Sequence, residues 1–184
     1  MKKYQIIYAD PPWAFENGWC WERTKSRADS HYPTMSIEDI CALPVKNICD
    51  EKCHLYLWTT SRDLMLGRAA KVCESWGFRP MNILTWGKPQ ISLGYYFRNS
   101  SEHLLFGVKG EKNRTLDRKQ GTWFISNRLK HSQKPPIVRN WIVKWSGDLP
   151  RLELFARKEK ELFEDESFEG WDVWGNEVES DIEL

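Results

Sequence analysis

The residues that most constrain the fold of this chain are a short apolar run and the loop that directly follows it. The run, Tyr4–Ala9, is nearly continuous and rich in β-branched and aromatic residues, which is typical of a buried strand. Asp10-Pro11-Pro12-Trp13 then stands where the strand ends. In an open α/β sheet, ligands bind outside the carboxyl ends of the strands. The sequence therefore predicts a ligand-facing loop that begins at Asp10.

The chemistry of this loop suits a substrate that donates hydrogen bonds. Pro11 and Pro12 fix their own φ angles and donate no N–H, and a following proline biases Asp10 toward an extended backbone. The loop is therefore stiff and shows mainly acceptors, which suits an amino group on a heteroaromatic ring. Trp13 offers a flat surface on which that ring could stack. The alternative interpretation is a strand-ending turn with a core tryptophan.

Strands and helices alternate along the rest of the chain. Further strands are expected at 53–59, 78–86, 103–108 and 152–156. Helices are expected from the Ser36 cap to Leu43, over 62–76 with Gly77 at the end, and from Pro135 to Trp145. The alternation predicts an α/β fold, a mostly parallel sheet flanked by helices.

Apolar residues at helical spacing define the expected buried faces. They are Met65, Ala69, Val72, Cys73 and Trp76 in one helix, and Ile137, Val138, Trp141, Ile142 and Trp145 in the other. Arg157 follows the strand at 152–156, so it is expected to share one rim of the sheet with Asp10.

Length and cysteine content narrow the class of protein. The 184 residues predict a single domain, 1–184, and no apolar stretch is long enough to span a membrane. Met1-Lys2-Lys3 leads straight into a strand, so we expect a cytoplasmic protein with reduced thiols. Cys49-x-x-x-Cys53-His54 has no second ligand pair at convincing spacing, so no metal is expected.

Charge is unevenly distributed although the net charge is only +1. The stretch 109–134 has no clear periodicity, is rich in cations and contains Trp123 and Phe124, which is what a polyanion-binding loop needs. The alternative is a solvated surface loop. The cations expected to contact a nucleic-acid backbone are Lys109, Lys112, Arg114, Arg118, Lys119, Arg128 and Lys130. The acidic tail, 177–184, is expected to be partly disordered.

Blocks of sequence beyond the first loop resemble the MT-A family of adenine-N6 methyltransferases, and they occur in the family order. They are Tyr32-Pro33-Thr34-Met35-Ser36, Leu57-Trp58-Thr59, Trp76-Gly77-Phe78, Leu84-Thr85-Trp86-Gly87-Lys88, Leu93-Gly94-Tyr95-Tyr96-Phe97-Arg98-Asn99, Glu102-His103-Leu104-Leu105-Phe106-Gly107-Val108-Lys109-Gly110, Ser132-Gln133-Lys134-Pro135, Leu152-Glu153-Leu154-Phe155-Ala156-Arg157, and Gly170-Trp171-Asp172 with Gly175-Asn176-Glu177.

The resemblance implies a Rossmann-like class I methyltransferase fold in permuted order, with an N-terminal catalytic loop and a C-terminal cofactor region. It implies catalytic roles for Asp10, Pro11, Pro12 and Trp13. It implies that S-adenosylmethionine is held by Asp10, Pro12, Lys134, Arg157, Asn176 and Glu177, and that the target base is held by Trp13, Tyr32, Glu102, Ser132 and Lys134. No G-x-G-x-x-G turn follows 152–156, so cofactor contacts are expected from other groups.

The expected reaction is methyl transfer to the N6 amino group of adenine in nucleic acid, without a covalent enzyme intermediate. DNA is favoured as the substrate and RNA is the alternative. Two rival interpretations are a non-catalytic nucleic-acid-binding partner subunit, and a methyltransferase for a small amine or a protein. The chain could also form a homodimer, or a heterodimer with a related subunit.

Overall fold

The computed structural model describes residues 2–14, 33–91, 96–111, 113–128, 133–157 and 168–184. Its elements in chain order are β1 (Tyr4–Ala9), α1 (Ile37–Ala42), α2 (Val45–Ile48), β2 (Cys49–Thr59), α3 (Ser61–Met65), α4 (Arg68–Ser75), β3 (Arg79–Gly87), β4 (Ser101–Lys109), β5 (Trp123–Ile125), α5 (Ile137–Ser146), β6 (Arg151–Leu154) and β7 (Asp172–Trp174).

Within these residues one seven-stranded sheet has the order β5-β3-β4-β2-β1-β6-β7. β1 pairs in parallel with both β2 and β6, β6 with β7, and β3 with β5. β4 alone runs antiparallel, against β2 and β3. The α/β, mostly parallel, Rossmann-like architecture expected from the sequence is thus confirmed.

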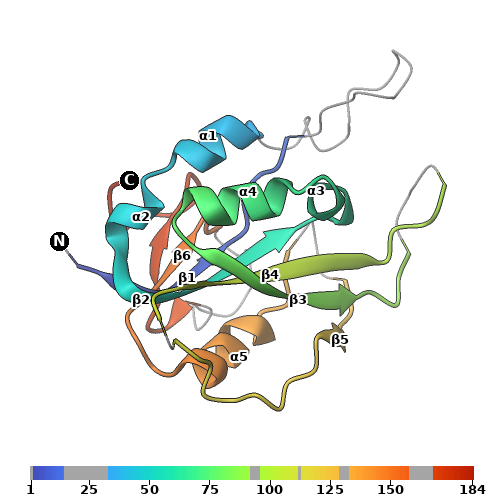
Figure 1. Ribbon diagram of the computed structural model, residues 1–184. Helices are drawn as coiled ribbons and strands as arrows, with labels where there is room; N and C mark the ends of the chain where they lie inside the picture. The colour runs from blue at the N-terminus through green and yellow to red at the C-terminus, as the bar shows by residue number, and fades with distance from the viewer. Residues whose placement is uncertain (1, 15–32, 92–95, 112, 129–132, 158–167) are drawn as a thin grey trace.

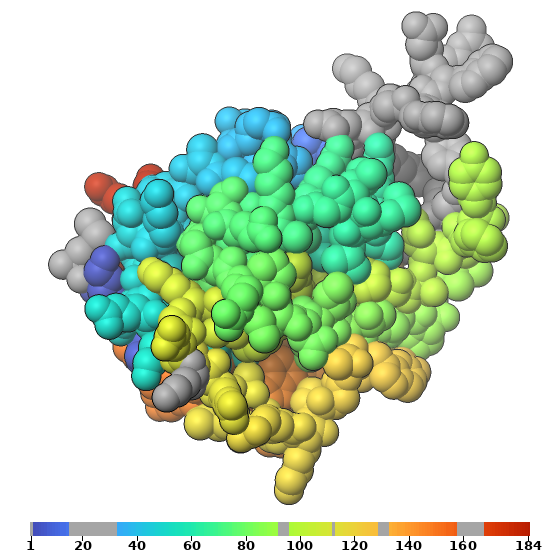
Figure 2. All heavy atoms as spheres, viewed as in Figure 1, coloured from blue at the N-terminus to red at the C-terminus, as the bar shows by residue number. Residues whose placement is uncertain are grey.

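Helices cover both faces of the sheet, with α1 and α4 on one side and α5 on the other (Figure 1). The space-filling view shows the first of these layers from outside (Figure 2). Alternate residues of β1 enter the two cores: Ile7 and Ala9 pack toward α1 and α4, whereas Ile6 and Tyr8 pack toward α5. Because β1 is buried on both faces, successive residues are apolar, which explains the continuous apolar run in the sequence.

The helix expected over 62–76 is two helices, which corrects the prediction. Gly67 has φ 71°, a left-handed conformation that glycine adopts without a Cβ penalty, and it ends α3 and precedes α4. The break turns Met65 outward, 77% exposed, so it is not part of the buried face. Ile137 is likewise 44% exposed at the start of α5. The Ser36 cap is confirmed, since its Oγ accepts a hydrogen bond from Asp39 N at 3.0 Å.

The acidic tail packs back along β7, where the sequence alone suggested disorder. Asp181 N donates to Val173 O at 2.9 Å, and Asp181 Oδ2 accepts from Val173 N at 2.8 Å. Ile182 and Leu184 rest against the core on the α1 side. Among the described residues, no helix is long and apolar enough to cross a membrane.

A buried ion pair joins α5 to the sheet. Arg139 Nε and Nη2 donate to the two carboxylate oxygens of Glu153, on β6, at 2.6 and 2.8 Å. The two side chains are only 10% and 8% exposed. The Arg139 guanidinium also lies 4.7 Å from the centre of the Phe168 ring. This bidentate pair fixes the first turn of α5 against β6.

Replacing one partner of this pair is expected to destabilise the fold strongly. Glu153→Gln leaves the Arg139 charge buried without its counter-charge, and we expect a loss of about 3–5 kcal/mol in the free energy of unfolding. Urea denaturation followed by tryptophan fluorescence measures it. The double variant Arg139→Met/Glu153→Leu removes both charges and should recover much of the loss. A single variant within about 1 kcal/mol of wild type would contradict the argument.

Candidate active site

One rim of the sheet collects the polar groups of the candidate site. β1, β2 and β3 end there, at Ala9, Thr59 and Gly87. Because β4 runs the opposite way, it begins at this rim: Ser101 pairs with Gly87 and His103 with Thr59. Glu102 is therefore brought to the same edge as Asp10, although it stands at the start of a strand and not at an end.

A chain of alternating charges runs along this rim. Lys134 Nζ lies 2.8 Å from Asp10 Oδ2 and 3.2 Å from Glu102 Oε2. Lys88, the residue after β3, forms an ion pair with the other oxygen of Glu102. The Lys134 side chain is 10% exposed and that of Asp10 25%, so the aspartate keeps access to solvent. The order Asp10–Lys134–Glu102–Lys88 joins segments that are far apart in the sequence.

The charges of Glu102 and Lys134 are maintained by their neighbours. Burial alone would raise the pKa of Glu102, but the Lys134 and Lys88 ammonium groups beside it outweigh burial and hold that pKa below its ordinary value. Burial alone would lower the pKa of Lys134, but Asp10 and Glu102 hold it above its ordinary value. These neighbours therefore keep Glu102 ionised and Lys134 protonated at neutral pH.

The loop after β1 is anchored from within the fold. Trp13 N donates to the Pro11 carbonyl at 2.9 Å, and Met35 N donates to the Pro12 carbonyl at 2.8 Å. A carbonyl oxygen has two lone pairs, so the Pro11 carbonyl can accept one further hydrogen bond. These bonds define the backbone that carries Asp10.

Trp13 itself lies in the core, as the alternative interpretation expected of this residue, and not at a surface where a base could stack. Its side chain is only 8% exposed, and its indole Nε1 donates to Trp58 O at 3.0 Å. Trp13 supports the loop from beneath. The burial of Trp13 does not support the stacking role that the sequence predicted for it.

The ends of β6 and β7 adjoin the end of β1. Asp10 N faces Leu154 O at 3.5 Å. Beyond β6, Phe155 has φ 62°, a left-handed conformation that is rare for an aromatic residue and is typical of functional loops. The chain then forms a parallel bridge between Arg157 and Glu177. Arg157 is half-buried, whereas Asn176 and Glu177 are exposed beside it. A cation, an amide and a carboxylate thus lie on the same rim as Asp10.

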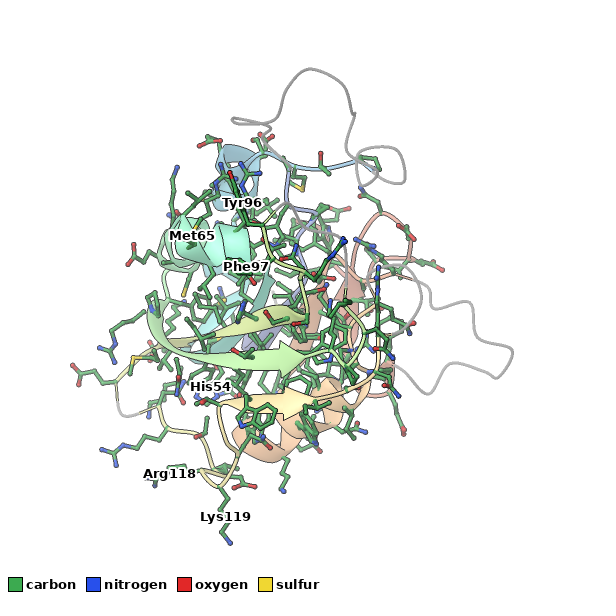
Figure 3. All side chains as sticks on the ribbon, turned by 90° about the vertical axis from the view of Figure 1, so that its right-hand side faces the viewer. His54, Met65, Tyr96, Phe97, Arg118 and Lys119 are labelled. Atoms are coloured by element: carbon green, nitrogen blue, oxygen red, sulfur yellow. The ribbon has the colours of Figure 1, made fainter. Side chains whose placement is uncertain are left out.

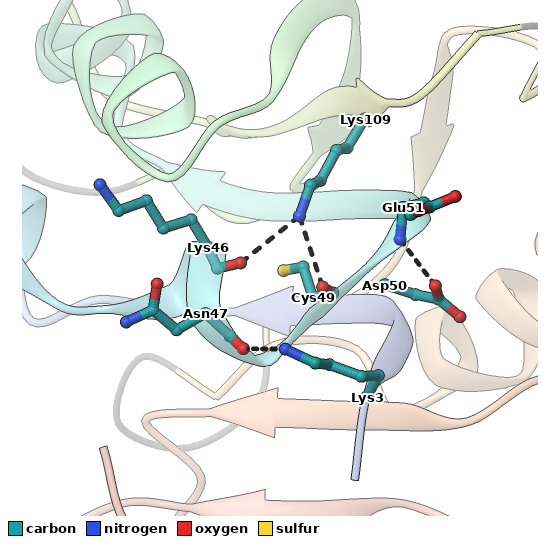
Figure 4. A pocket seen from close by; sticks show the side chains of 7 residues that line it. All are labelled: Lys3, Lys46, Asn47, Cys49, Asp50, Glu51 and Lys109. Atoms are coloured by element: carbon teal, nitrogen blue, oxygen red, sulfur yellow. Dashed lines mark hydrogen bonds between the residues drawn. The ribbon is translucent and has the colours of Figure 1, made fainter. Parts of the chain in front are cut away.

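Several predicted backbone-binding cations lie away from this rim. Lys109 ends β4 at the opposite end of the sheet, where its Nζ donates to Lys46 O and Cys49 O, both at 3.4 Å. Arg114 follows Asn113, whose side chain donates to Lys109 O. Arg118 and Lys119 lie at the α5 edge of the molecule, away from Tyr96 and Phe97 (Figure 3). Lys109 there lines a separate pocket with Lys3 and Lys46 (Figure 4).

Arg128 is the predicted cation from 109–128 that does lie near the site, within the described residues. Its N donates to Gln90 Oε1 at 3.0 Å, just beyond the end of β3. Tyr32, Lys112, Lys130 and Ser132 lie outside the described residues. Sequence reasoning assigned no role to Lys88, although this residue stands two positions after the expected strand at 78–86. The strand-end argument applied there would have found it.

The sequence is similar to those of several known proteins. The family model described as MT-A70 matches residues 4–177. The Type II methyltransferase M.MunI of a Mycoplasma species is 29% identical over 197 residues, which covers 96% of this chain and 78% of the relative. The human N(6)-adenosine-methyltransferase catalytic subunit METTL3 is 26% identical over 166 residues, covering 84% of this chain and 26% of the relative. An MT-A70-like N(6)-adenosine-methyltransferase of Arabidopsis thaliana is 26% identical, and this chain spans 24% of it.

The charge chain predicts a specific acid sensitivity. The pKa of Glu102 is lower in the fold than in the unfolded chain, so this group stabilises the fold above its unfolded pKa, and the contribution disappears as pH falls through the folded pKa. Between about pH 5.5 and about pH 3.5, the urea midpoint of wild type should fall more than that of Glu102→Gln. Glu74→Gln, an exposed position on α4, is the control. Parallel curves for wild type and Glu102→Gln would refute the ionic linkage.

Proposed function

The chain belongs to the MT-A70 family, and on that basis we propose that it transfers a methyl group from S-adenosylmethionine to the N6 amino group of adenine in DNA. The observation that carries the proposal is the position of Asp10. It is an accessible carboxylate on a doubly anchored loop, ion-paired with Lys134, at the rim where β1, β2 and β6 meet. The relatives of this chain include proteins named as N(6)-adenosine-methyltransferases.

The chemical problem is that the adenine amino nitrogen is a poor nucleophile, because its lone pair is delocalised into the ring. Asp10 and the Pro11 carbonyl would accept the two hydrogen bonds that the adenine amino group donates. These bonds would draw the nitrogen toward tetrahedral geometry. Lys134 engages Asp10 through Oδ2, and the carboxylate has further lone pairs for the substrate. Negative charge fixed at Asp10 offsets the positive charge that develops on the nitrogen.

Lys134 and Glu102 act on Asp10 by position. The ammonium group keeps the Asp10 carboxylate oriented, and Glu102 in turn holds the ammonium group from its other side. Because the aspartate is oriented before the base arrives, little reorganisation is needed during the reaction. Burial of Lys134 makes these ionic contacts stronger than they would be in water.

The polar side chains beyond β6 fit the expected cofactor. S-adenosylmethionine, when bound, supplies an electrophilic methyl group. Its own carboxylate needs a cation, for which Arg157 and Lys134 are candidates, and its ribose hydroxyls need acceptors such as Glu177 and Asn176. Arg157 and Glu177 are bridged at the rim that Asp10 shares. Side chains would thus replace the glycine-rich turn that this chain lacks.

DNA is favoured over RNA because of how the relatives align. This chain spans 78% of the Type II methyltransferase, but about a quarter of the length of the METTL3 and Arabidopsis relatives. The specific observation in favour of RNA is that those relatives are named for adenosine, a ribonucleoside.

One experiment separates these possibilities. DNA and RNA oligomers of matched sequence are incubated with the protein and S-adenosylmethionine, digested to nucleosides and analysed by mass spectrometry for N6-methyladenine. We expect the modified base in DNA. Modification of RNA alone would change the substrate. The absence of modification in both, together with binding of either oligomer, would support the non-catalytic partner subunit instead.

Replacing the catalytic carboxylate tests the mechanism. Asp10→Asn keeps the size of the side chain but removes its negative charge, and its amide can donate as well as accept. We expect kcat to fall by at least about 100-fold while the affinity for DNA changes little. Steady-state methylation and DNA binding are measured side by side, with Glu74→Gln as the control. Turnover within about threefold of wild type would refute the role of Asp10.

The cofactor residues are tested separately. Glu177→Gln weakens an acceptor for the ribose hydroxyls, so we expect the KM for S-adenosylmethionine to rise by about 10-fold while the KM for DNA stays unchanged. Calorimetric titration of S-adenosylhomocysteine gives the same comparison without turnover. Glu179→Gln, an exposed acid of the same tail, is the matched control. Equal effects at both positions would exclude a specific contact at Glu177.

A further inference from the structure

Two adjacent aromatic side chains project from the molecule beside the candidate site. Tyr96 is 92% exposed and Phe97 is 87% exposed, the highest values among the large hydrophobic side chains that the structure describes. Arg98, also exposed, follows them. We call Tyr96, Phe97 and Arg98 the aromatic finger. Large apolar side chains held fully in water indicate a surface that another molecule covers.

The base of the finger is firmly held. Gly87 pairs with Ser101, and Lys88 N donates to Ser100 O at 2.7 Å. Beyond them, Gln90 Nε2 donates to Asn127 Oδ1 at 3.2 Å. The two ends of the connection between β3 and β4 are therefore paired where they leave the sheet, and its described residues project beyond the end of the sheet (Figure 1).

The finger stands on the same rim as the charge chain. In Figure 3, where this rim faces the viewer, Tyr96 and Phe97 lie in the half of the view that holds Met65, away from Arg118 and Lys119. Tyr96 precedes Glu102 by six residues, so the two are at most about 20 Å apart even if the chain between them is fully extended. One nucleic-acid duplex can therefore touch the finger and Asp10 at once.

The surroundings of the finger suit a polyanion. Arg98 belongs to the finger, and Arg128 is tied to the hairpin base through Gln90. Asn99 and Ser100 add amide and hydroxyl groups of the kind that contact phosphates. Residues 96–100 contain no carboxylate. Aromatic rings flanked by cations favour stacked bases with phosphates on either side over an acidic or purely apolar partner.

We propose that Tyr96 and Phe97 enter the base stack of a DNA duplex and occupy the gap left when the target adenine turns out toward Asp10. Stacking in the duplex hides the amino group, so the base must leave the helix before methyl transfer. Apolar side chains that wedge between base steps offset the loss of stacking. This role rests on the proposed function and assigns to the finger the extraction of the base, separate from the chemistry at Asp10.

The test compares substrates in which the base is held tightly or loosely. The methylated sequence is first mapped on plasmid DNA treated with the wild-type protein. Three oligomers carrying that sequence are then used: the perfect duplex, a duplex with an abasic site opposite the target adenine, and the single strand. A fourth, with 2-aminopurine at the target position of the duplex, reports extrusion of the base by an increase in fluorescence.

The variant Tyr96→Ala/Phe97→Ala removes both rings from positions that contribute little to the core. On the perfect duplex we expect kcat/KM to fall by about 10- to 100-fold and the 2-aminopurine signal to be lost. On the single strand and on the abasic duplex we expect rates within about twofold and fivefold of wild type, respectively. The exchange Tyr96→Phe/Phe97→Tyr keeps both rings and should retain duplex activity. Met81→Ala, an exposed apolar position near the other end of β3, is the control.

Each other outcome overturns the proposal in a recognisable way. Equal losses on duplex and single strand would show that the finger supports the fold or the site and not extraction of the base. A change from dimer to monomer in sedimentation, with equal losses on all oligomers, would assign the finger to contacts between copies of this chain. Full activity of the double variant on the perfect duplex would also exclude the role, and so would a wild-type protein that methylates the single strand but no duplex. If wild type methylates no oligomer, the proposed function itself fails.

Discussion

The ionic contacts of Lys134 are the interaction on which the rest of the rim depends. They join Asp10, 124 residues earlier in the chain, to Glu102 at the start of β4. With only 10% of its side chain exposed, this lysine is stable as a cation only because carboxylates flank it. The same ammonium group helps to keep Glu102 ionised. Electrostatic pairing thus sets both the geometry of the site and the charge that it offers to a ligand.

Packing on the α5 side of the sheet supports this arrangement. α5 begins three residues after Lys134, and the Arg139–Glu153 pair fixes its first turn on β6. β6 lies beside β1, which carries Asp10 at its end. The position of Lys134 relative to Asp10 is therefore determined by a short path of rigid contacts: helix to strand, strand to strand, strand to loop. A buried ion pair outside the candidate site thus still has a part in aligning the charged groups of that site.

The sequence predicts the features that have a local cause. Continuous apolarity identified β1, the Ser36 cap marked the start of α1, and strand-end logic placed Asp10 and Arg157 on one rim. Sequence reasoning missed features that depend on contacts between distant segments, or that are too short to show a periodic pattern. β5 and β7 have three residues each, too few for a period, and they exist because a neighbouring strand pairs with them. Gly67 breaks a helix whose apolar spacing is continuous. The two partners of Glu102, Lys88 and Lys134, come from two separate segments, and only resemblance pointed to Glu102.

The antiparallel direction of β4 has an evolutionary consequence. A parallel neighbour of β3 would need a long crossover, whereas β3 and β4 are joined by a hairpin anchored at Gly87 and Ser101. Residues can be inserted at the end of such a hairpin, or deleted from it, without shifting the register of any strand or disturbing the paired charges behind it. Under the proposed function, related chains could therefore acquire new nucleic-acid preferences by changing this one connection while the residues around Asp10 stay unchanged.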